Sequence, residues 1–313
     1  MRLKESVYPQ LVDLRSLDQA FDRILNAAFR TPPPARLCHY TDWTGLSGIL
    51  HSRELWATDF RAQKTDALEF QHADQAIVDT ASELAEQLAM RYRRSDLLRR
   101  AALEYPENAV TRSSDKELFI TSFCTTPDNA SVWHRFGGEG TGYAIEFSIH
   151  PTELVDTSSM GVVAVKVDYS IESVRSRLRR VFCQTVDQRC LFSGPESDMA
   201  DMYTLRSIWM LSTRTAAQYK SLQHADDCEW RRLVFAPQRH RFETEPATLP
   251  VVHEKPKVHV KVPIRRGRKR PKLYAIHIGQ NAPPNAEADV AAVLEAEGYI
   301  KAYAPQIIRV RSL

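Results

Sequence analysis

Paired cysteines are missing from this sequence of 313 residues. It has five cysteines, an odd number, and no two of them form a Cys-x-x-Cys pair. This argues against a disulfide framework and a zinc ribbon, and it fits a reducing compartment. The histidines also stand at no familiar ligand spacing, so no metal site is expected.

Long apolar runs are missing as well. No window approaches the ~20 apolar residues that a membrane-spanning helix needs. Charged side chains interrupt Met1–Asp22, where a secretory signal would require an apolar stretch. We therefore expect a soluble, cytoplasmic protein with no membrane partner.

The sequence also lacks a large excess of charge of either sign. Lys and Arg number 42 and Asp and Glu 39, which gives a net charge of +3. This balance implies no general affinity for nucleic acid or membrane, so any electrostatic argument must be local. With 43% hydrophobic and 26% charged residues, the chain is typical of a folded protein, and disorder, collagen and coiled coil are excluded as descriptions of the whole.

The N-terminal segment differs in character from the rest of the chain. An amphipathic stretch over Leu17–Phe29 is followed by Pro32–Pro34, a run that removes backbone donors and forbids a helix. We therefore predict an N-terminal helical extension and connector over residues 1–35 and one main domain over residues 36–313.

Strand-like and helix-like segments are mixed along the main domain, which predicts an α+β fold with a helical insertion. The expected strands are Leu37–Thr41, Leu118–Cys124, Gly142–Phe147, Val162–Val167, Trp230–Phe235, Leu273–Gly279 and Gln306–Val310. The expected helices are Asp42–Ser52, one or two over Asp66–Tyr105, Ile171–Cys190, Asp198–Tyr219 and Ala286–Glu297. Between them, residues 237–272 are proline-rich and predict a long excursion, with a hairpin over His253–Pro263.

Three segments carry the functional signal, and each also has a plainer interpretation. A lone buried histidine is more often a hydrogen-bonded core residue than a working one. The aromatic residues of the second segment suit a core, and the third segment reads equally as a charged helix end that runs into an edge strand. The segments are His39–Thr41, Ser122–Phe147 and Tyr219–Leu233.

The order of these segments resembles a bacterial family of unknown function whose members look like ADP-ribosyltransferases. That family has a His-Tyr-Thr strand, an acidic segment, a Ser-Phe strand with a Trp-containing turn, and a late Lys before a Glu-x-x-Arg strand. Here the acidic segment keeps Asp66 and Glu69, the turn has Val132 and Phe136 where the family has Met and Tyr, and the late strand begins at Glu229. The resemblance spans about residues 36–313.

The resemblance implies an ADP-ribosyltransferase-like split β-sheet that holds NAD as cosubstrate in a cleft between two small sheets. His39 would hydrogen-bond the adenosine ribose, and the backbone near Tyr40 and Thr41 would bind the nicotinamide amide. Glu229 would hydrogen-bond the nicotinamide ribose and stabilise the charge that develops as nicotinamide leaves. An aromatic ring would stack on the nicotinamide. The cofactor-binding candidates of the second segment are Ser122, Phe123, Trp133 and Phe136.

The chemistry itself requires a carboxylate at such a site. Breaking the bond to a cationic pyridinium builds positive charge on the ribose, and a fixed carboxylate in a dry cleft lowers that barrier. Asp227 stands two residues before Glu229, a spacing that on a strand points both carboxylates to one face and would let them divide the work. The alternative is that Asp227 is a solvated loop acid. Lys220 is expected to pair with a phosphate or with Glu69, or, as a surface lysine, with neither.

A basic run in the excursion points to the acceptor. Nine cations follow the single acid Glu254, and such a run is typical of contacts to the phosphates of RNA or DNA, preferably single-stranded. The alternative is a solvated loop that only keeps the protein soluble. The predicted nucleic-acid-binding residues are Lys255, Lys257, Lys261, Arg265, Arg266, Arg268, Lys269, Arg270 and Lys272.

Three functions remain open from the sequence. The first is an NAD-dependent ADP-ribosyltransferase, a toxin or an antiviral defence effector, that modifies nucleic acid in preference to protein and would require an antitoxin partner. The second is an NAD glycohydrolase that transfers ADP-ribose to water. The third is a non-catalytic nucleic-acid-binding module that uses the basic run.

Overall fold

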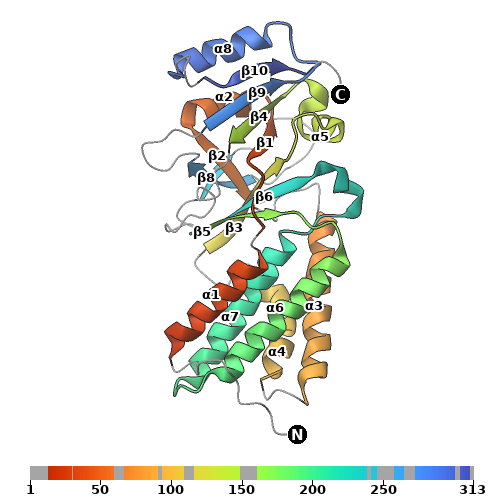
Figure 1. Cartoon of the computed structure of the whole chain (residues 1–313), viewed down its shortest axis with the longest axis vertical. Helices are drawn as coiled ribbons and strands as arrows, with labels where there is room; N and C mark the ends of the chain where they lie inside the picture. The colour runs from red at the N-terminus through yellow and green to blue at the C-terminus, as the bar shows by residue number, and fades with distance from the viewer. Residues whose placement is uncertain are drawn as a thin grey trace. The chain divides into compact units, whose positions relative to one another are not determined.

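The computed structural model describes ten stretches of the chain, residues 13–29, 31–59, 67–90, 94–108, 116–148, 161–237, 241–244, 257–263, 272–299 and 304–310. The chain divides into two compact units, which we describe separately. One comprises residues 1–30, 66–115 and 170–219, and the other residues 31–65, 116–169 and 220–313. The first is helical and the second contains the strands (Figure 1).

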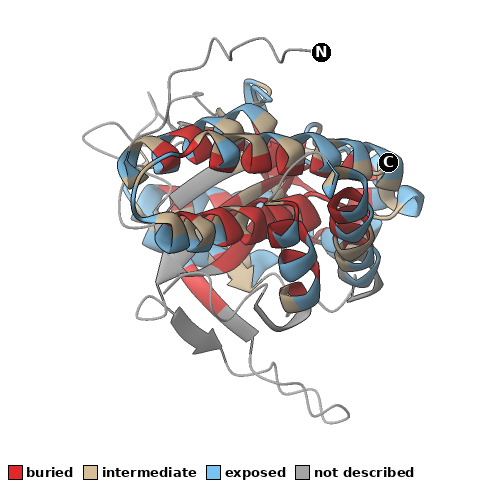
Figure 2. Cartoon of the chain, turned by 90° about the horizontal axis from the view of Figure 1, so that it is seen from below, coloured by how far each residue is buried: buried red, intermediate tan, exposed pale blue. Residues whose placement is uncertain are grey.

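The helical unit is built from α1 (Leu14–Ala28), α3 (Ala67–Leu88), α4 (Asp96–Asn108), α6 (Ile171–Leu191) and α7 (Ser197–Ala216). α3 packs on α4 and α6, α7 packs on α4 and α6, and α1 packs on α6 and α7. Buried residues lie on the sides of the helices that face one another (Figure 2). The predicted N-terminal helix is thus part of one bundle with helices that come from two later stretches of the chain.

The sheet unit is α+β with a mixed sheet. Its strands are β1 (Arg36–Thr41), β2 (Glu54–Asp59), β3 (Lys116–Cys124), β4 (Tyr143–Ser148), β5 (Gly161–Lys166), β6 (Glu229–Pro237), β7 (Arg241–Thr244), β8 (Lys257–Pro263), β9 (Lys272–Ile278) and β10 (Gln306–Arg309). Their order is β10-β9-β4-β1-β3-β2-β8-β7, and β6 pairs with both β3 and β5. The β9–β10 ladder is parallel, and the other ladders between described strands are antiparallel.

The sheet divides at β3. One edge of β3 pairs with β6 over its whole length, from Lys116 to Cys124. The other edge is shared, because β2 pairs with Phe119 and Ile120 whereas β1 pairs through Cys38 and Cys124. β1 continues into β4, so two groups of strands meet at the carboxyl end of β3.

Helices cover the β1–β4–β9 group on both faces. On one face, Leu37, Ile145 and Ile276 share a core cluster with residues of α2 (Trp43–Ser52) and α8 (Ala286–Ala296). On the other face, Cys38, Tyr40 and Ala144 pack with α5 (Ala130–Phe136). β4 is accordingly buried at every position from Tyr143 to Phe147, as a strand covered on both faces should be.

Close backbone approach holds the turn after α5. Gly279 follows β9, and a Cβ atom at that position would come 2.0 Å from the carbonyl oxygen of Gly140. Asn281 N–H donates to the same oxygen at 2.9 Å, so the loop fits only because residue 279 has no side chain.

Most of the predicted elements are confirmed, and two regions differ. β2 was not expected from the sequence. The predicted hairpin over His253–Pro263 is wrong, because β8 occupies Lys257–Pro263 and its partners are β7 and β2. Tertiary pairing with two distant strands, rather than a local turn, determines this strand.

Substitution of the core of the helical unit tests its packing. Phe182 of α6 is fully buried, whereas Leu103 of α4 is 75% exposed. Phe182→Ala should lower the free energy of unfolding by about 3–5 kcal/mol, because it leaves a cavity. Leu103→Ala should change it by less than about 0.5 kcal/mol. Urea unfolding measures both values, and an equal loss in the two variants would contradict this packing.

Candidate functional site

The three predicted segments meet where the sheet divides. His39 on β1 places Nδ1 2.9 Å from the backbone oxygen of Ser122 on β3. The Ser122 hydroxyl donates to Oε1 of Glu229 on β6 at 2.7 Å. Residues that are more than 80 positions apart in sequence are thereby connected by two consecutive hydrogen bonds.

His39 can be assigned a tautomer from its partner. A carbonyl oxygen only accepts, so Nδ1 of His39 carries the proton and donates it. Burial lowers the pKa of His39, so the ring is neutral at neutral pH. Nε2 of the neutral ring is then a hydrogen-bond acceptor.

Glu229 is a buried carboxylate surrounded by donors. The residue is 4% exposed. Oε1 accepts from Ser122 and from Nε of Arg231 at 2.8 Å, and Oε2 accepts from Nζ of Lys220 at 2.7 Å. Burial alone would raise the pKa of Glu229, but the charges of Arg231 and Lys220 and their hydrogen bonds outweigh it and lower the pKa to about 2. Glu229 is therefore ionised at neutral pH.

Two groups beside Glu229 stay protonated. Burial, with the negative charge of Glu229 as a further cause, raises the pKa of Cys124 to about 12. The same two influences, burial first, raise the pKa of Tyr169, although the backbone N–H of Glu229 donates to the Tyr169 hydroxyl at 2.9 Å. The negative charge at this point of the site is thus carried by Glu229 and not by its thiol and phenol neighbours.

Lys220 joins Glu229 to a second carboxylate. Its Nζ donates to Oδ2 of Asp227 at 2.9 Å, and Oδ1 of Asp227 accepts from Arg135. Asp227 is 1% exposed and Lys220 is 2% exposed. Asp227 is thus not a solvated loop acid, and Lys220 is not a surface lysine. The two carboxylates do not share a strand face either, because Asp227 ends the 3₁₀ turn η5 (Leu222–Asp227) and Cys228, with φ 47°, redirects the chain before β6.

Local capping brings Arg135 to this network. The side chain of Asn129 accepts from the N–H of Val132 at the start of α5 and donates to the backbone oxygen of Asp226 in η5. α5 therefore lies against η5, and Arg135, near its carboxyl end, reaches Asp227. We call Glu229, Lys220, Asp227 and Arg135 the carboxylate network.

The three aromatic candidates lie in different environments. Trp133 is fully buried, stacks edge-on against Tyr40 at 5.0 Å and donates from Nε1 to the Pro127 oxygen at 2.7 Å. Phe123 is also buried, 5.8 Å from the His39 ring. Phe136 is 43% exposed, and Nζ of Lys220 lies 5.5 Å from its ring centre. Phe136 is the candidate among the three with a ring surface open to a ligand.

Tyr40 and Thr41 follow His39 on β1. The Tyr40 hydroxyl donates to the Thr126 oxygen at 3.0 Å, which ties β1 to the loop after β3. Thr41 is partly buried and lies beside Gly45 of α2, where an added Cβ would meet the Thr41 hydroxyl at 1.9 Å. Both residues also pair with β4, Tyr40 opposite Ala144 and Thr41 opposite Tyr143.

Several predicted residues lie outside the described part of the chain. These include Asp66 and the side chain of Glu69, so the structure does not place the acidic segment. In the basic run, β8 and β9 place the backbone of Lys257, Lys261 and Lys272, and the Lys261 side chain is exposed. Lys255, Arg265, Arg266, Arg268, Lys269 and Arg270 lie outside the described residues.

Sequence reasoning missed three residues of the site. Arg231 contacts Glu229 because alternate residues of a strand share a face, a signal that was present in the spacing. Arg135 and Tyr169 had no such signal, because each reaches the site through packing of α5 or of the turn before α6.

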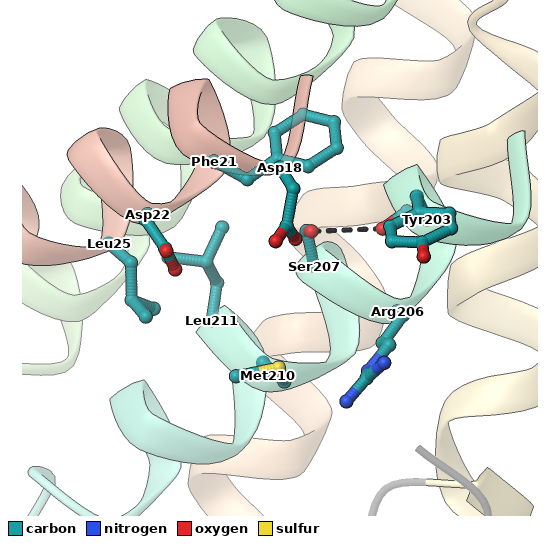
Figure 3. A pocket seen from close by; sticks show the side chains of 9 residues that line it. All are labelled: Asp18, Phe21, Asp22, Leu25, Tyr203, Arg206, Ser207, Met210 and Leu211. Carbon is teal, nitrogen blue, oxygen red and sulfur yellow. Dashed lines mark hydrogen bonds between the residues drawn. The ribbon is translucent and has the colours of Figure 1, made fainter. Parts of the chain in front are cut away.

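A separate hollow lies in the helical unit, between α1 and α7, with a volume of about 290 Å³ (Figure 3). Asp18 and Asp22 line it from α1, and Tyr203 and Arg206 line it from α7. Both acids are exposed. It contains none of the predicted site residues.

Comparisons with known proteins add no assignment. No protein-family model matches the chain, and neither a curated protein nor a solved structure matches it. Among the described residues, no cluster of His, Cys, Asp and Glu could hold a metal ion. In the same part of the chain, no helix is both long and apolar enough to cross a membrane.

The ionisation of Glu229 predicts a pH dependence of stability. Its pKa is lowered from 4.5 to about 2, so its contribution is complete above pH about 4.5 and is lost as the pH falls toward 2. The fall in pKa corresponds to about 3 kcal/mol. Urea unfolding from pH 7 to pH 2.5 should show the free-energy difference between wild type and Glu229→Gln shrinking below pH 4.5. A constant difference would contradict this electrostatic account.

Trp133 and Phe136 should differ in their effect on stability. Trp133→Ala removes a fully buried ring and should cost about 3–5 kcal/mol of unfolding free energy. Phe136→Ala removes a ring that is nearly half exposed and should cost less than about 1 kcal/mol. Thermal and urea unfolding compare the two variants, and a larger loss for Phe136→Ala would mean that its ring belongs to the core.

Proposed function

We propose that this protein is an NAD-dependent ADP-ribosyltransferase with the split-sheet fold of that enzyme class. The observation that supports the proposal most is the connection of His39, Ser122 and Glu229 at the point where the sheet divides. These are the residues that the resemblance assigns to the adenosine ribose, the central strand and the nicotinamide ribose.

The reaction breaks one bond and forms one. The bond between C1′ of the nicotinamide ribose and the ring nitrogen breaks, and its electron pair goes to the ring, so nicotinamide leaves neutral. A lone pair of the acceptor forms the new bond to C1′, and the acceptor loses a proton. Positive charge builds on the ribose in between, and an ionised carboxylate fixed beside it lowers the barrier.

Glu229 has the capacity for this role. A carboxylate has about four lone-pair sites. Ser122 and Arg231 use two on Oε1, and Lys220 uses one on Oε2. One site on Oε2 is left for the hydroxyl of the nicotinamide ribose. Arg231 and Lys220 keep the group ionised, so it needs no proton transfer before it acts.

His39 and Phe136 are the binding residues in this proposal. Neutral His39 donates from Nδ1 to the backbone, so its Nε2 would accept a hydrogen bond from an adenosine ribose hydroxyl. The exposed ring of Phe136 is the surface for the nicotinamide. Trp133 and Phe123 then support the site from the core.

The proposed acceptor is a macromolecule, with single-stranded RNA or DNA favoured over protein. Support comes from the nine cations of residues 255–272, which suit phosphates without regard to sequence. We propose further that the enzyme acts in the cytoplasm as a toxin or a defence effector and that an antitoxin protein restrains it.

A single labelling experiment tests this function. Wild type and Glu229→Gln are incubated with NAD labelled in the adenosine part and with separate pools of RNA, DNA and protein. Nicotinamide release should fall about 10²–10³-fold in Glu229→Gln, because one preorganised electrostatic group is removed. Label should appear in nucleic acid. Phe136→Ala, an exposed change, should raise KM for NAD, and Glu86→Gln on the surface of α3 serves as the matched control.

Each other outcome identifies a different function. Label in protein alone excludes the nucleic-acid acceptor. Nicotinamide release without labelled polymer indicates an NAD glycohydrolase. A wild-type protein that turns over no NAD but binds RNA or DNA would overturn the proposal in favour of a binding module.

A further inference from the structure

We propose that Asp227 is a positioning residue, which holds Lys220 against Glu229 and takes no proton from the acceptor. The inference rests on the proposed function. The sequence suggested that Glu229 and Asp227 divide the work, one on the ribose and one on the acceptor. Here Glu229 acts on the ribose, and Asp227 acts only through Lys220.

Asp227 is enclosed, and a cation contacts each of its oxygens. Oδ2 accepts from Lys220 at 2.9 Å and Oδ1 accepts from Arg135. The side chain of Asp227 is 1% exposed. A base must reach the proton that it removes within about 3 Å, and the enclosed side chain of Asp227 gives an acceptor no such approach. The acceptor proton therefore passes to water.

The position of Lys220 depends on two carboxylates and on its own backbone. Nζ of Lys220 has two carboxylate partners, Asp227 and Glu229, at 2.9 and 2.7 Å. Its backbone is fixed as well, since its N–H donates to the Asp168 oxygen at 3.1 Å. Asp227 thus fixes the position of the ammonium that donates to Glu229.

Lys220 also connects Glu229 to the exposed aromatic ring. Its Nζ lies 5.5 Å from the centre of the Phe136 ring, and the guanidinium of Arg135 lies at the same distance. The direct hydrogen bond of Lys220 is to Glu229, so movement of the ammonium would affect the carboxylate first. Because Asp227 is not placed against the substrate and acts through this carboxylate, its replacement should affect kcat more than KM.

The first test compares three variants with wild type and Glu86→Gln. Asp227→Asn should lower kcat about tenfold and leave KM for NAD within about twofold, with the shape of the pH profile of kcat/KM unchanged. Lys220→Met should lower kcat further, and Lys220→Arg, which keeps the charge, should restore part of it. If Asp227→Asn instead removes the acidic limb of the profile, where activity falls as a base becomes protonated, Asp227 is the base and the proposal is wrong.

The second test does not depend on turnover. The side-chain carboxyl of Glu229 is followed by ¹³C NMR from pH 7 to pH 2.5 in the same proteins, with circular dichroism to confirm folding. Its titration should move to higher pH in Lys220→Met, because a cation beside the carboxylate is removed. Loss of the Asp227 charge alone would move the titration to lower pH, so a smaller move to higher pH in Asp227→Asn would report displacement of the ammonium. Identical titrations in wild type and both variants would overturn the positioning role of Asp227. Failure of the wild type to turn over NAD would refute the proposed function, and the titration can still be measured in that case.

Discussion

A single ionised carboxylate in a dry place organises this site. Burial of Glu229 is costly unless cations and donors compensate it. Three donors from different elements supply that compensation. Arg231 lies on β6 with Glu229, Lys220 lies in the loop before β6, and Ser122 lies on the neighbouring strand β3. The position of Lys220 in turn depends on Asp227, and that of Asp227 on Arg135 of α5. Removal of Lys220, for example, takes one cationic partner from Glu229 and from Asp227 at the same time.

The resemblance, and not a local pattern, singled out His39, Ser122 and Glu229 as candidate site residues. The local composition predicted the three strands that carry or adjoin them. Asp227 and Lys220 could not be placed in this way, because the turn at Cys228 and the capping of α5 by Asn129 determine their positions. A spacing of two residues predicts a shared face only where the backbone is extended, and here the backbone changes direction between the two carboxylates.

The same difference between local patterns and long-range contacts decides which elements of the fold could be predicted. Elements with their own periodicity, such as β1 and α6, were predicted within a few residues, whereas β2 and β8 exist because they pair with each other. Trp56 of β2 is exposed between the buried residues Leu55 and Ala57, so three apolar residues follow one another and the polar–apolar alternation of a half-buried strand is absent. The grouping of α1 with α6 and α7 likewise arises from packing between residues more than 140 positions apart, and local patterns carry no information about such contacts.

The hydrogen bond from His39 to the Ser122 backbone has a consequence for how variants of this histidine are interpreted. β1 and β3 are paired at one position, Cys38 with Cys124, and beyond it the imidazole supplies a bond to the strand edge that a backbone amide would supply in a continuous ladder. The His39 ring therefore holds β1 against β3, and in the proposed function it also binds the dinucleotide. A His39 variant could lose activity because it no longer binds NAD or because β1 separates from β3. Only a replacement that keeps a hydrogen-bond donor at the Nδ1 position would distinguish these two effects.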